Sequence, residues 1–484
     1  MTSRPDRYRH LLDPDEFAQL EAAIQRPLPP ALRVNTLKID LEDARRVWPI
    51  EYGWQIQPVP FCGSGWQIDG NEESLSRTIE HRMGFYYIQD AASMLPAEMF
   101  NYDDDLPLIL DMAASPGGKT THLASKIHDR GLIIANDSSS GRIGALRSNL
   151  QTWGAMSAAL SSYPGERFGE WFPDTFHKVL LDAPCSGESL RTDERRKTRF
   201  VSTKERLQLQ HRQIKLLTSA FQAVKPGGQI VYATCTLAPE EDEAVIDALL
   251  KQHPHQATIE AVDHILPLPA PALTNEGERE FEREIGKAVR LWPHLYDTSG
   301  FFAALIRKCD SIESPSFGGI GVESTMPPVR SLAQAGFAPM TSQQQHEVID
   351  YLNETYGFDL SVVIDLQRLE LWRRDRSVYA LPDRFVSPFA DFPCIAVGML
   401  IGEWSDVVFV PSHELIARFS SQFTGQRWML ADDQVTHWLT GVDLRGLTLP
   451  YPISRVILLE DEEHRFIGRG KVLRDRLRNL LPRR

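Results

Sequence analysis

Cysteine is scarce in this sequence. Five cysteines occur among 484 residues, an odd number without regular spacing. A disulfide framework needs paired cysteines, so the count argues against one and indicates a reducing compartment. Long apolar runs are missing too. No segment approaches the roughly 20 residues of a membrane span, and Met1–His10 lack the apolar core of a signal peptide. We therefore expect a cytoplasmic protein that does not enter membranes.

The sequence also lacks an excess of positive charge, because its formal net charge is −13. Phosphate contacts favour basic surfaces, so this total argues against a uniformly basic nucleic-acid binder. Basic residues nevertheless gather between Arg191 and Lys215, directly after Cys185. A second basic group lies near the C-terminus and comprises Arg465, Arg469, Lys471, Arg474, Arg476, Arg478, Arg483 and Arg484. A solvated helix face would explain either group alone, but the position beside Cys185 favours a polyanionic partner.

Strand and helix patterns alternate from about residue 106 onwards. We expect strands at 106–112, 131–136, 177–181, 229–233 and 300–307, and helices at 119–128, 142–153 and 203–224. A further helix is expected from Pro239, where the acids Glu240–Glu243 would be stabilised by the helix dipole. This alternation predicts an α/β fold whose mostly parallel sheet carries helices on both faces.

The length of the chain predicts about two to four domains. We expect an N-terminal extension over residues 1–100 and the α/β domain over 101–310. Residues 311–390 would form a linker, rich in Ser, Gly and Pro at Ser311–Pro328, and a small intermediate module. Short apolar segments split by turns predict a β-rich module over 391–484.

The segment Leu108–Thr120 reads as a strand that enters a Gly-Gly turn and then a helix. Such a turn lets the backbone approach a ligand, and the helix N-terminus offers unpaired N–H groups. The next strand ends at Asp137, an acid placed to bind both ribose hydroxyls of a nucleotide-like cofactor. The loop lacks the spacing of a phosphate loop and the third glycine of the dinucleotide fingerprint. A cofactor with ribose but no phosphates fits, and S-adenosylmethionine is the common one.

Two short motifs carry a cysteine just past an expected strand: Asp182–Gly187, which contains Cys185, and Thr234-Cys235-Thr236. Carbon 5 of cytosine is a poor nucleophile, but a thiolate added at carbon 6 makes it able to accept a methyl group. A base must then remove the carbon-5 proton so that the thiolate can leave. Asp182 could protonate or hydrogen-bond N3 of the base. A single free cysteine is usually a small buried hydrophobe, as we expect for Cys62, Cys309 and Cys394. The spacing alone does not say which of the other two attacks.

These motifs resemble those of the Sun/Fmu-type RNA cytosine-C5 methyltransferases. Ala113–Thr120 resembles the family's cofactor loop, and the two cysteine motifs resemble its Asp-Ala-Pro-Cys-Ser-Gly and Thr-Cys-Ser/Thr segments. Arg33–Lys38 and Gly84–Ser93 also match family segments. The likeness spans roughly residues 30 to 310, and it is specific because few other enzymes combine both cysteine motifs.

The resemblance implies a Rossmann-like S-adenosylmethionine-dependent methyltransferase with an N-terminal RNA-binding extension. It also implies a PUA-like module that includes Trp438–Arg484. Cys235 would be the nucleophile, Cys185 would assist proton removal and product release, and Asp182 would lie between cofactor and cytosine. The residues expected to hold the cofactor are Ala113, Ala114, Ser115, Pro116, Gly117, Gly118, Lys119, Asp137, Arg142, Pro164 and Asp182. Pro164 departs from the family, which usually has an aspartate there, so only a backbone contact can substitute. We expect no metal.

The likeness extends to the bacterial members that act on small-subunit rRNA. It implies methylation of carbon 5 of one cytidine in 16S rRNA through a covalent Cys–cytosine intermediate, by a monomer. The substrate would be ribosomal RNA, either naked or in the assembled small subunit. The same chemistry on tRNA or at another rRNA position is an alternative. An RNA-binding assembly factor is disfavoured because Asp182, Cys185 and Cys235 are all present. A DNA enzyme would use a Pro-Cys thiol such as Cys185 but has no use for Thr234–Thr236.

Overall fold

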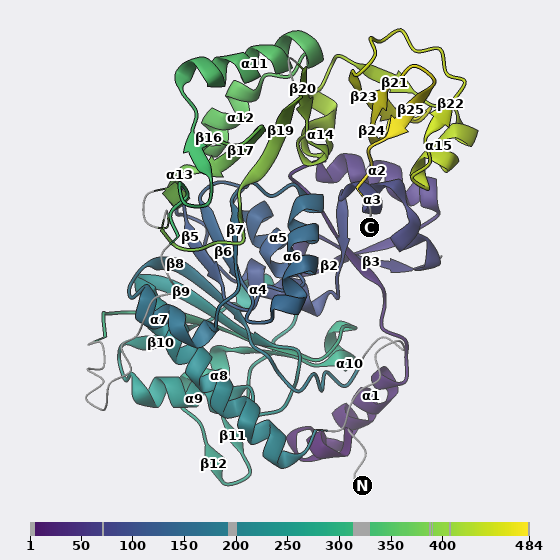
Figure 1. The fold of residues 1–484 in the computed structure, drawn as a ribbon. Helices are drawn as coiled ribbons and strands as arrows, with labels where there is room; N and C mark the ends of the chain where they lie inside the picture. Colours follow the sequence, from purple (N-terminus) through teal and green to yellow (C-terminus); the bar gives the residue numbers. More distant parts are fainter. Residues whose placement is uncertain are drawn as a thin grey trace.

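The computed structural model describes residues 5–69, 72–191, 201–312, 330–386, 389, 391–405 and 408–482. The chain forms a central α/β domain, an N-terminal part whose sheet lies beside it, and two C-terminal β-rich modules above them (Figure 1). The predicted linker Ser311–Pro328 lies almost entirely outside the described residues. Among the helices in the described ranges, we find none with the length and apolar character that a bilayer crossing requires.

The central sheet has the strand order β10-β14-β9-β8-β5-β6-β7-β18. The strands β5 to β9 run parallel, whereas β10, β14 and β18 are antiparallel to their neighbours. Their bounds are β5 Leu108–Asp111, β6 Leu132–Asn136, β7 Ala158–Ser161, β8 Phe176–Asp182, β9 Val224–Thr234, β10 Ala257–Glu260, β14 Phe301–Lys308 and β18 Ala396–Val397; β13 (Val289–Leu291) pairs with β14. This arrangement confirms the predicted Rossmann-like sheet.

Helices cover both faces of the central sheet because successive side chains of a buried strand point to opposite sides. Ile109, for example, packs in the cluster with helices α5 and α6, whereas Leu110 packs with α8 and α9. The helices are α5 (Gly118–Lys126), α6 (Ser140–Trp153), α7 (Phe168–Trp171), α8 (Thr203–Ala223), α9 (Glu243–Gln252) and α10 (Pro293–Tyr296), with 3-10 turns η4 (Gly165–Arg167), η5 (Asp263–Ile265) and η6 (Arg283–Lys287). The hairpin β11 (Asn275–Glu276) and β12 (Arg279–Glu280) projects from this region.

The N-terminal part holds a second, four-stranded sheet of order β2-β3-β1-β4. Its elements are η1 (Pro5–Leu11), α1 (Pro14–Ile24), β1 (Ala31–Val34), α2 (Leu41–Tyr52), β2 (Gln55–Val59), β3 (Cys62–Asp69), η2 (Glu72–Arg77), α3 (Ile79–Met83), β4 (Tyr86–Ile88), η3 (Ala92–Met94) and α4 (Leu95–Glu98). The buried Arg33 donates to Gly118 O at 2.9 Å and to Thr121 Oγ1 at 2.7 Å, both on α5. This side chain therefore ties the N-terminal sheet to the helix that follows the expected cofactor loop.

The first C-terminal module is a five-stranded sheet of order β15-β16-β17-β19-β20. It comprises β15 (Phe337–Pro339), α11 (Ser342–Tyr356), α12 (Leu360–Gln367), β16 (Leu369–Arg374), β17 (Ser377–Pro382), α13 (Asp383–Val386), β19 (Met399–Ser405), β20 (Val408–Pro411) and α14 (His413–Phe419). The domain boundary expected at residue 390 falls inside this sheet. The intervening strand β18 leaves the module and pairs with β7 of the central sheet, a long-range pairing that the local sequence does not signal.

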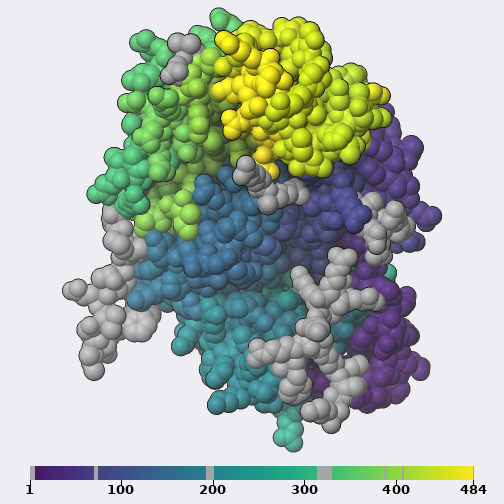
Figure 2. All heavy atoms as spheres, turned by 45° about the vertical axis from the view of Figure 1, so that its right-hand side comes forward, coloured from purple at the N-terminus to yellow at the C-terminus, as the bar shows by residue number. Residues whose placement is uncertain are grey.

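The second C-terminal module has the strand order β21-β23-β24-β25-β22. Its elements are η7 (Ser420–Gln422), β21 (Arg427–Met429), α15 (Asp432–Leu439), β22 (Leu444–Arg445), β23 (Val456–Glu460), β24 (Phe466–Val472) and β25 (Arg476–Asn479). In Figure 2 this yellow module packs directly on the purple and blue N-terminal part. Arg465 of this module contacts the N-terminal part, because it pairs with Glu51 and lies 3.8 Å from Glu80.

The helix predicted from Pro239 begins later, since α9 starts at Glu243 and the residues before it form turns. The predicted stabilisation of these acids by the helix dipole is wrong as well. Asp242 and Glu243 are fully buried and face Arg290, which donates to Glu243 Oε1 at 3.0 Å from Nε and lies 3.6 Å from Asp242. A buried ion cluster, rather than the helix dipole, therefore holds these acids.

We predict that Arg290→Met destabilises the protein by about 3–5 kcal/mol, because it removes the buried cation that faces two buried carboxylates. Chemical denaturation would measure the change. The matched control is Arg46→Met, which removes an exposed ion pair with Asp43 and should cost less than about 1 kcal/mol. Equal losses for the two variants would contradict this explanation.

Candidate active site

The adjacent strands β8 and β9 bring the two motif cysteines together past their carboxyl ends. The sulfur atoms of Cys185 and Cys235 lie 3.2 Å apart. Asp182, at the end of β8, accepts a hydrogen bond of 2.8 Å from Nζ of Lys119 at the start of α5. The structure thus gathers the three residues expected to be catalytic at one edge of the sheet, next to the expected cofactor loop.

The two thiols have different affinities for a proton. A hydrogen bond from Cys185 stabilises the thiolate of Cys235 and lowers the pKa of Cys235. The positive charge of nearby Lys119 also lowers this pKa, whereas desolvation by the surrounding protein opposes the shift. The same hydrogen bond, together with burial, raises the pKa of Cys185 well above its ordinary value. Cys235 is also exposed, whereas Cys185 is only partly so. The two pKa shifts, rather than the sulfur–sulfur distance itself, therefore favour a Cys235 thiolate that accepts a hydrogen bond from a Cys185 thiol.

Lys119 carries the positive charge of the site. Burial opposes that charge, but the Asp182 carboxylate outweighs burial and raises the pKa of the ammonium group. The ammonium also lies 5.7 Å from the centre of the Phe301 ring. The Lys119–Asp182 pair fixes the Asp182 side chain beside the two thiols, where it could contact the face of a base.

The expected cofactor loop lies between β5 and α5. Gly117 adopts φ = +111°, a backbone conformation that L side chains rarely adopt, so the turn requires glycine. Asp111, at the end of β5, accepts a 2.6 Å hydrogen bond from Thr120, and its other oxygen has no partner among the described residues. Burial raises the pKa of Asp111 to about 7. A buried carboxylate with a free oxygen beside a helix N-terminus suits a cofactor that carries both a positive centre and a carboxylate, so the donor set fits S-adenosylmethionine.

Asp137 lies at the edge of the same loop, as expected. Its carboxylate accepts hydrogen bonds from Ser115 N at 3.2 Å and Ser139 N at 2.9 Å, and Arg142 lies 3.4 Å away. The Asp137 side chain is only 4% exposed, so little of the carboxylate is open to a ligand in this structure. Pro164 is exposed and opens the η4 turn after β7.

Part of the expected basic surface is used inside the protein. Arg191 is buried and bonds to Asp297 at 2.6 Å, and Arg206 is buried against Glu188. Residues 192–200 lie outside the described part of the chain, whereas Lys204, Arg212 and Lys215 are exposed. In the C-terminal group, Arg465 and the partly buried Arg469 make internal contacts, Arg476 pairs with Asp443, and Arg474 and Arg478 are exposed. The exposed basic surface is therefore smaller than the two basic segments of the sequence predict.

Sequence reasoning missed the residues that hold the Cys185 loop. Glu241 and Gln213 are buried and contact the backbone on either side of Cys185. From the sequence alone, the acidic run after Cys235 predicts the start of a helix. Only the folded chain shows that one of these acids turns back to the other cysteine motif.

Comparisons with known proteins agree with this site. Residues 99–307 match the family described as "16S rRNA methyltransferase RsmB/F", and residues 5–91 match the "N-terminal domain of 16S rRNA methyltransferase RsmF". A protein of Pectobacterium carotovorum, named ribosomal RNA small subunit methyltransferase F, is 31% identical over 98% of this chain and 92% of its own length. A protein of the same name from Vibrio cholerae is 32% identical over 98% of this chain and 94% of its own length.

Solved structures show the same fold. A methyltransferase homolog from Pyrococcus horikoshii has a TM-score of 0.55 and 35% identity, covering 63% of this chain and 93% of the homolog. A structure titled as NSun6 from Pyrococcus horikoshii with SFG has a TM-score of 0.54 and 21% identity, covering 64% of this chain and 99% of its own. That second likeness supports the fold alone.

The fold and the site define an S-adenosylmethionine-dependent methyltransferase. More narrowly, the chain belongs to the 16S rRNA methyltransferase RsmB/F family, whose profile and named relatives together match almost its whole length.

We predict that iodoacetamide alkylates Cys235 at a lower pH than Cys185, because only the thiolate reacts and the Cys235 pKa is the lowered one. The alkylation rate of each cysteine, followed by mass spectrometry across pH, would measure this. Cys185→Ala removes the hydrogen-bond donor and should shift the Cys235 profile to higher pH, whereas Cys185→Ser should shift it less. A Cys235 profile that does not respond to Cys185→Ala would contradict the shared-proton arrangement.

Proposed function

We propose that this protein transfers a methyl group from S-adenosylmethionine to carbon 5 of a specific cytidine in 16S rRNA. The single observation that carries the proposal is the pair of thiols 3.2 Å apart beside Asp182 and the cofactor loop. Relatives that match nearly the full chain support the choice of substrate, since they are named as ribosomal RNA small subunit methyltransferases.

In this proposal the Cys235 thiolate adds to carbon 6 of cytosine, and the electron pair of the carbon 5–carbon 6 double bond moves towards N3, which Asp182 protonates or hydrogen-bonds. S-adenosylmethionine supplies the methyl group that carbon 5 then takes. Cys185 is the candidate for the base that takes the carbon-5 proton, once its own thiol proton has passed to solvent. The carbon 6–sulfur bond then breaks to release the Cys235 thiolate, and N3 returns its proton, which restores the ring. The lowered pKa of Cys235 supports its assignment as nucleophile.

The cofactor would be held by the loop Ala113–Lys119, by Asp137 and by Asp182, with Arg142 and the backbone of Pro164 at the rim. Support comes from the Gly117 turn and the acid at the end of β6. Because the Asp137 side chain is 4% exposed and Arg142 lies 3.4 Å from its carboxylate, we infer that cofactor binding is accompanied by movement of the Arg142 side chain.

We predict that Asp137→Ala weakens the binding of S-adenosylmethionine by about 2–3 kcal/mol, because two hydrogen bonds to the ribose are lost. Isothermal titration calorimetry would measure the affinity. Asp43→Ala, at an exposed position of α2, serves as a control with the same charge change. Unchanged affinity in Asp137→Ala would count against its assignment to the ribose.

Ribosomal RNA would contact the exposed cations near the site and on the second C-terminal module. Lys204, Arg212 and Lys215 lie on α8, which follows the Cys185 motif, and Arg474 and Arg478 lie near β25. The target cytidine must leave its stack before a thiolate can reach carbon 6. We further propose that residues 1–100 and the PUA-like C-terminal module bind RNA, and that the enzyme acts in the cytoplasm as a monomer.

The two cysteines should fail in different ways when they are replaced. We predict that Cys235→Ala abolishes both methylation and any covalent adduct with a 16S rRNA fragment. Cys185→Ala should still form the carbon 6–sulfur bond but release it slowly, so that an RNase-sensitive protein–RNA species accumulates on denaturing gels. Cys309→Ala, at an exposed thiol remote from both motifs in sequence, is the control. An adduct trapped by Cys235→Ala and absent from Cys185→Ala would reverse the roles.

A further inference from the structure

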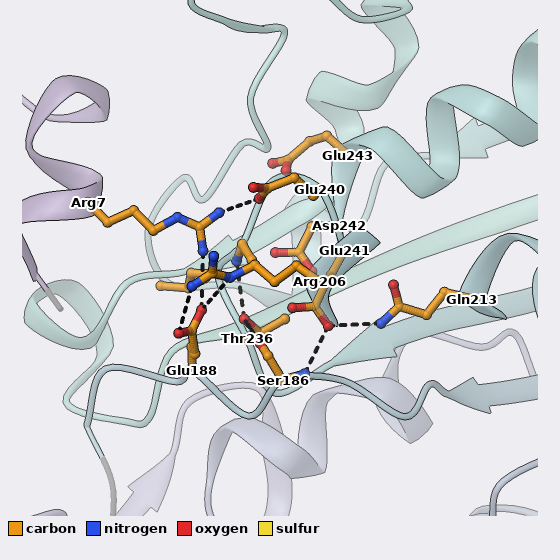
Figure 3. Close-up of polar contacts among 12 residues, drawn as sticks. Arg7, Ser186, Glu188, Arg206, Gln213, Thr236, Glu240, Glu241, Asp242 and Glu243 are labelled. Atoms are coloured by element: carbon orange, nitrogen blue, oxygen red, sulfur yellow. Dashed lines mark hydrogen bonds and ion pairs between the residues drawn. The ribbon is translucent and has the colours of Figure 1, made fainter. Parts of the chain in front are cut away.

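Glu241 follows Cys235 by six residues but turns back to the loop that carries Cys185. Its Oε2 atom accepts a hydrogen bond of 2.8 Å from the backbone N–H of Ser186 and one of 3.0 Å from Nε2 of Gln213. Gln213 also donates to the backbone oxygen of Pro184 at 2.9 Å. The residues immediately before and after Cys185 are therefore both held by this pair. Figure 3 shows Glu241 between Ser186 and Gln213.

The pair is completely enclosed by protein. Glu241 and Gln213 have no solvent exposure, and Oε1 of Glu241 has no hydrogen-bond partner among the described residues. Burial raises the pKa of Glu241 accordingly. A buried carboxylate contributes little net stability, because removing it from water offsets what its contacts supply. We therefore expect Glu241 to act through the geometry that it imposes on the loop.

Other contacts fix the same loop from different directions. Oγ of Ser186 donates to Oγ1 of Thr236 at 3.1 Å, which joins the residues that directly follow the two cysteines. Farther along the loop, Glu188 receives two hydrogen bonds of 3.0 Å from Arg206 on α8. Glu241 differs from these contacts because it binds the backbone next to Cys185 itself, and the Cys185 sulfur has to keep its place while the base and the methyl group change position.

We propose that Glu241 is a positioning residue that holds Cys185 where it serves the last step, the removal of the carbon-5 proton and the release of Cys235. This inference rests on the proposed function, in which Cys185 acts in that step. Glu241 reaches the reacting atoms only through the Ser186 N–H and through Gln213. Its loss should therefore affect release of the RNA more than the attack of Cys235 or the binding of either substrate.

The test uses the full-length enzyme with a 16S rRNA fragment and S-adenosylmethionine. Glu241→Ala should lower kcat about tenfold with little change in KM, and the covalent protein–RNA adduct should accumulate as in Cys185→Ala. Glu241→Gln keeps an oxygen that accepts from Ser186 and should restore release to near the wild-type rate. Glu240→Ala is the matched control, because that neighbouring carboxylate pairs with Arg7 rather than with the Cys185 backbone, and it should show no adduct.

Thermal unfolding and calorimetric binding of S-adenosylmethionine would show that each variant is folded. The inference is overturned if folded Glu241→Ala turns over without an adduct, or if it loses adduct formation and methylation together. It is also overturned if Glu241→Gln fails to restore release. If Cys185→Ala itself traps no adduct, the assignment of Cys185 fails instead, so the two failures can be told apart.

Discussion

The site depends on one contact, the 3.2 Å approach of the Cys185 and Cys235 sulfurs. This contact exists because β8 and β9 are parallel neighbours, paired from Lys178 with Gln229 to Asp182 with Ala233. Their carboxyl ends therefore open at the same edge of the sheet, where open α/β folds place their ligands. Because the pKa of Cys235 is lowered and that of Cys185 is raised, the Cys235 sulfur is the one able to attack and the Cys185 sulfur is the one able to donate.

The surrounding structure preserves that contact and supplies its electrostatic setting. Lys119 brings a positive charge from α5, and Arg33 fixes the start of α5 from the N-terminal sheet. The C-terminal modules are also anchored to the catalytic domain. Strand β18 extends the central sheet beyond β7, and Arg418 of α14 is buried and lies 3.8 Å from Asp129. These contacts join the C-terminal modules directly to the catalytic sheet.

Much of this arrangement could be predicted from the sequence because it follows from local patterns. Apolar strands that end in Asp111, Asp137 and Asp182, with glycines at 117 and 118, indicate a parallel sheet with a cofactor loop at its carboxyl edge. Tertiary contacts decided the rest. Asp242 and Glu243 are buried against Arg290, which lies about fifty residues further on. Arg191 and Arg206 lie in a basic run, yet both make internal ion pairs. Strand β18 lies in the sequence between strands of the first C-terminal module but pairs with β7 of the central sheet. No local sequence pattern predicts this pairing.

The most direct measurement is a map of 5-methylcytosine in ribosomal and transfer RNA from cells with and without the gene. The account predicts that one cytidine of 16S rRNA loses its methyl group when the gene is deleted. The wild-type gene should restore that methyl group, and a gene that encodes Cys235→Ala should not. An unchanged 16S rRNA together with loss of methylation in tRNA would contradict the proposed substrate, and full restoration by Cys235→Ala would contradict the proposed chemistry.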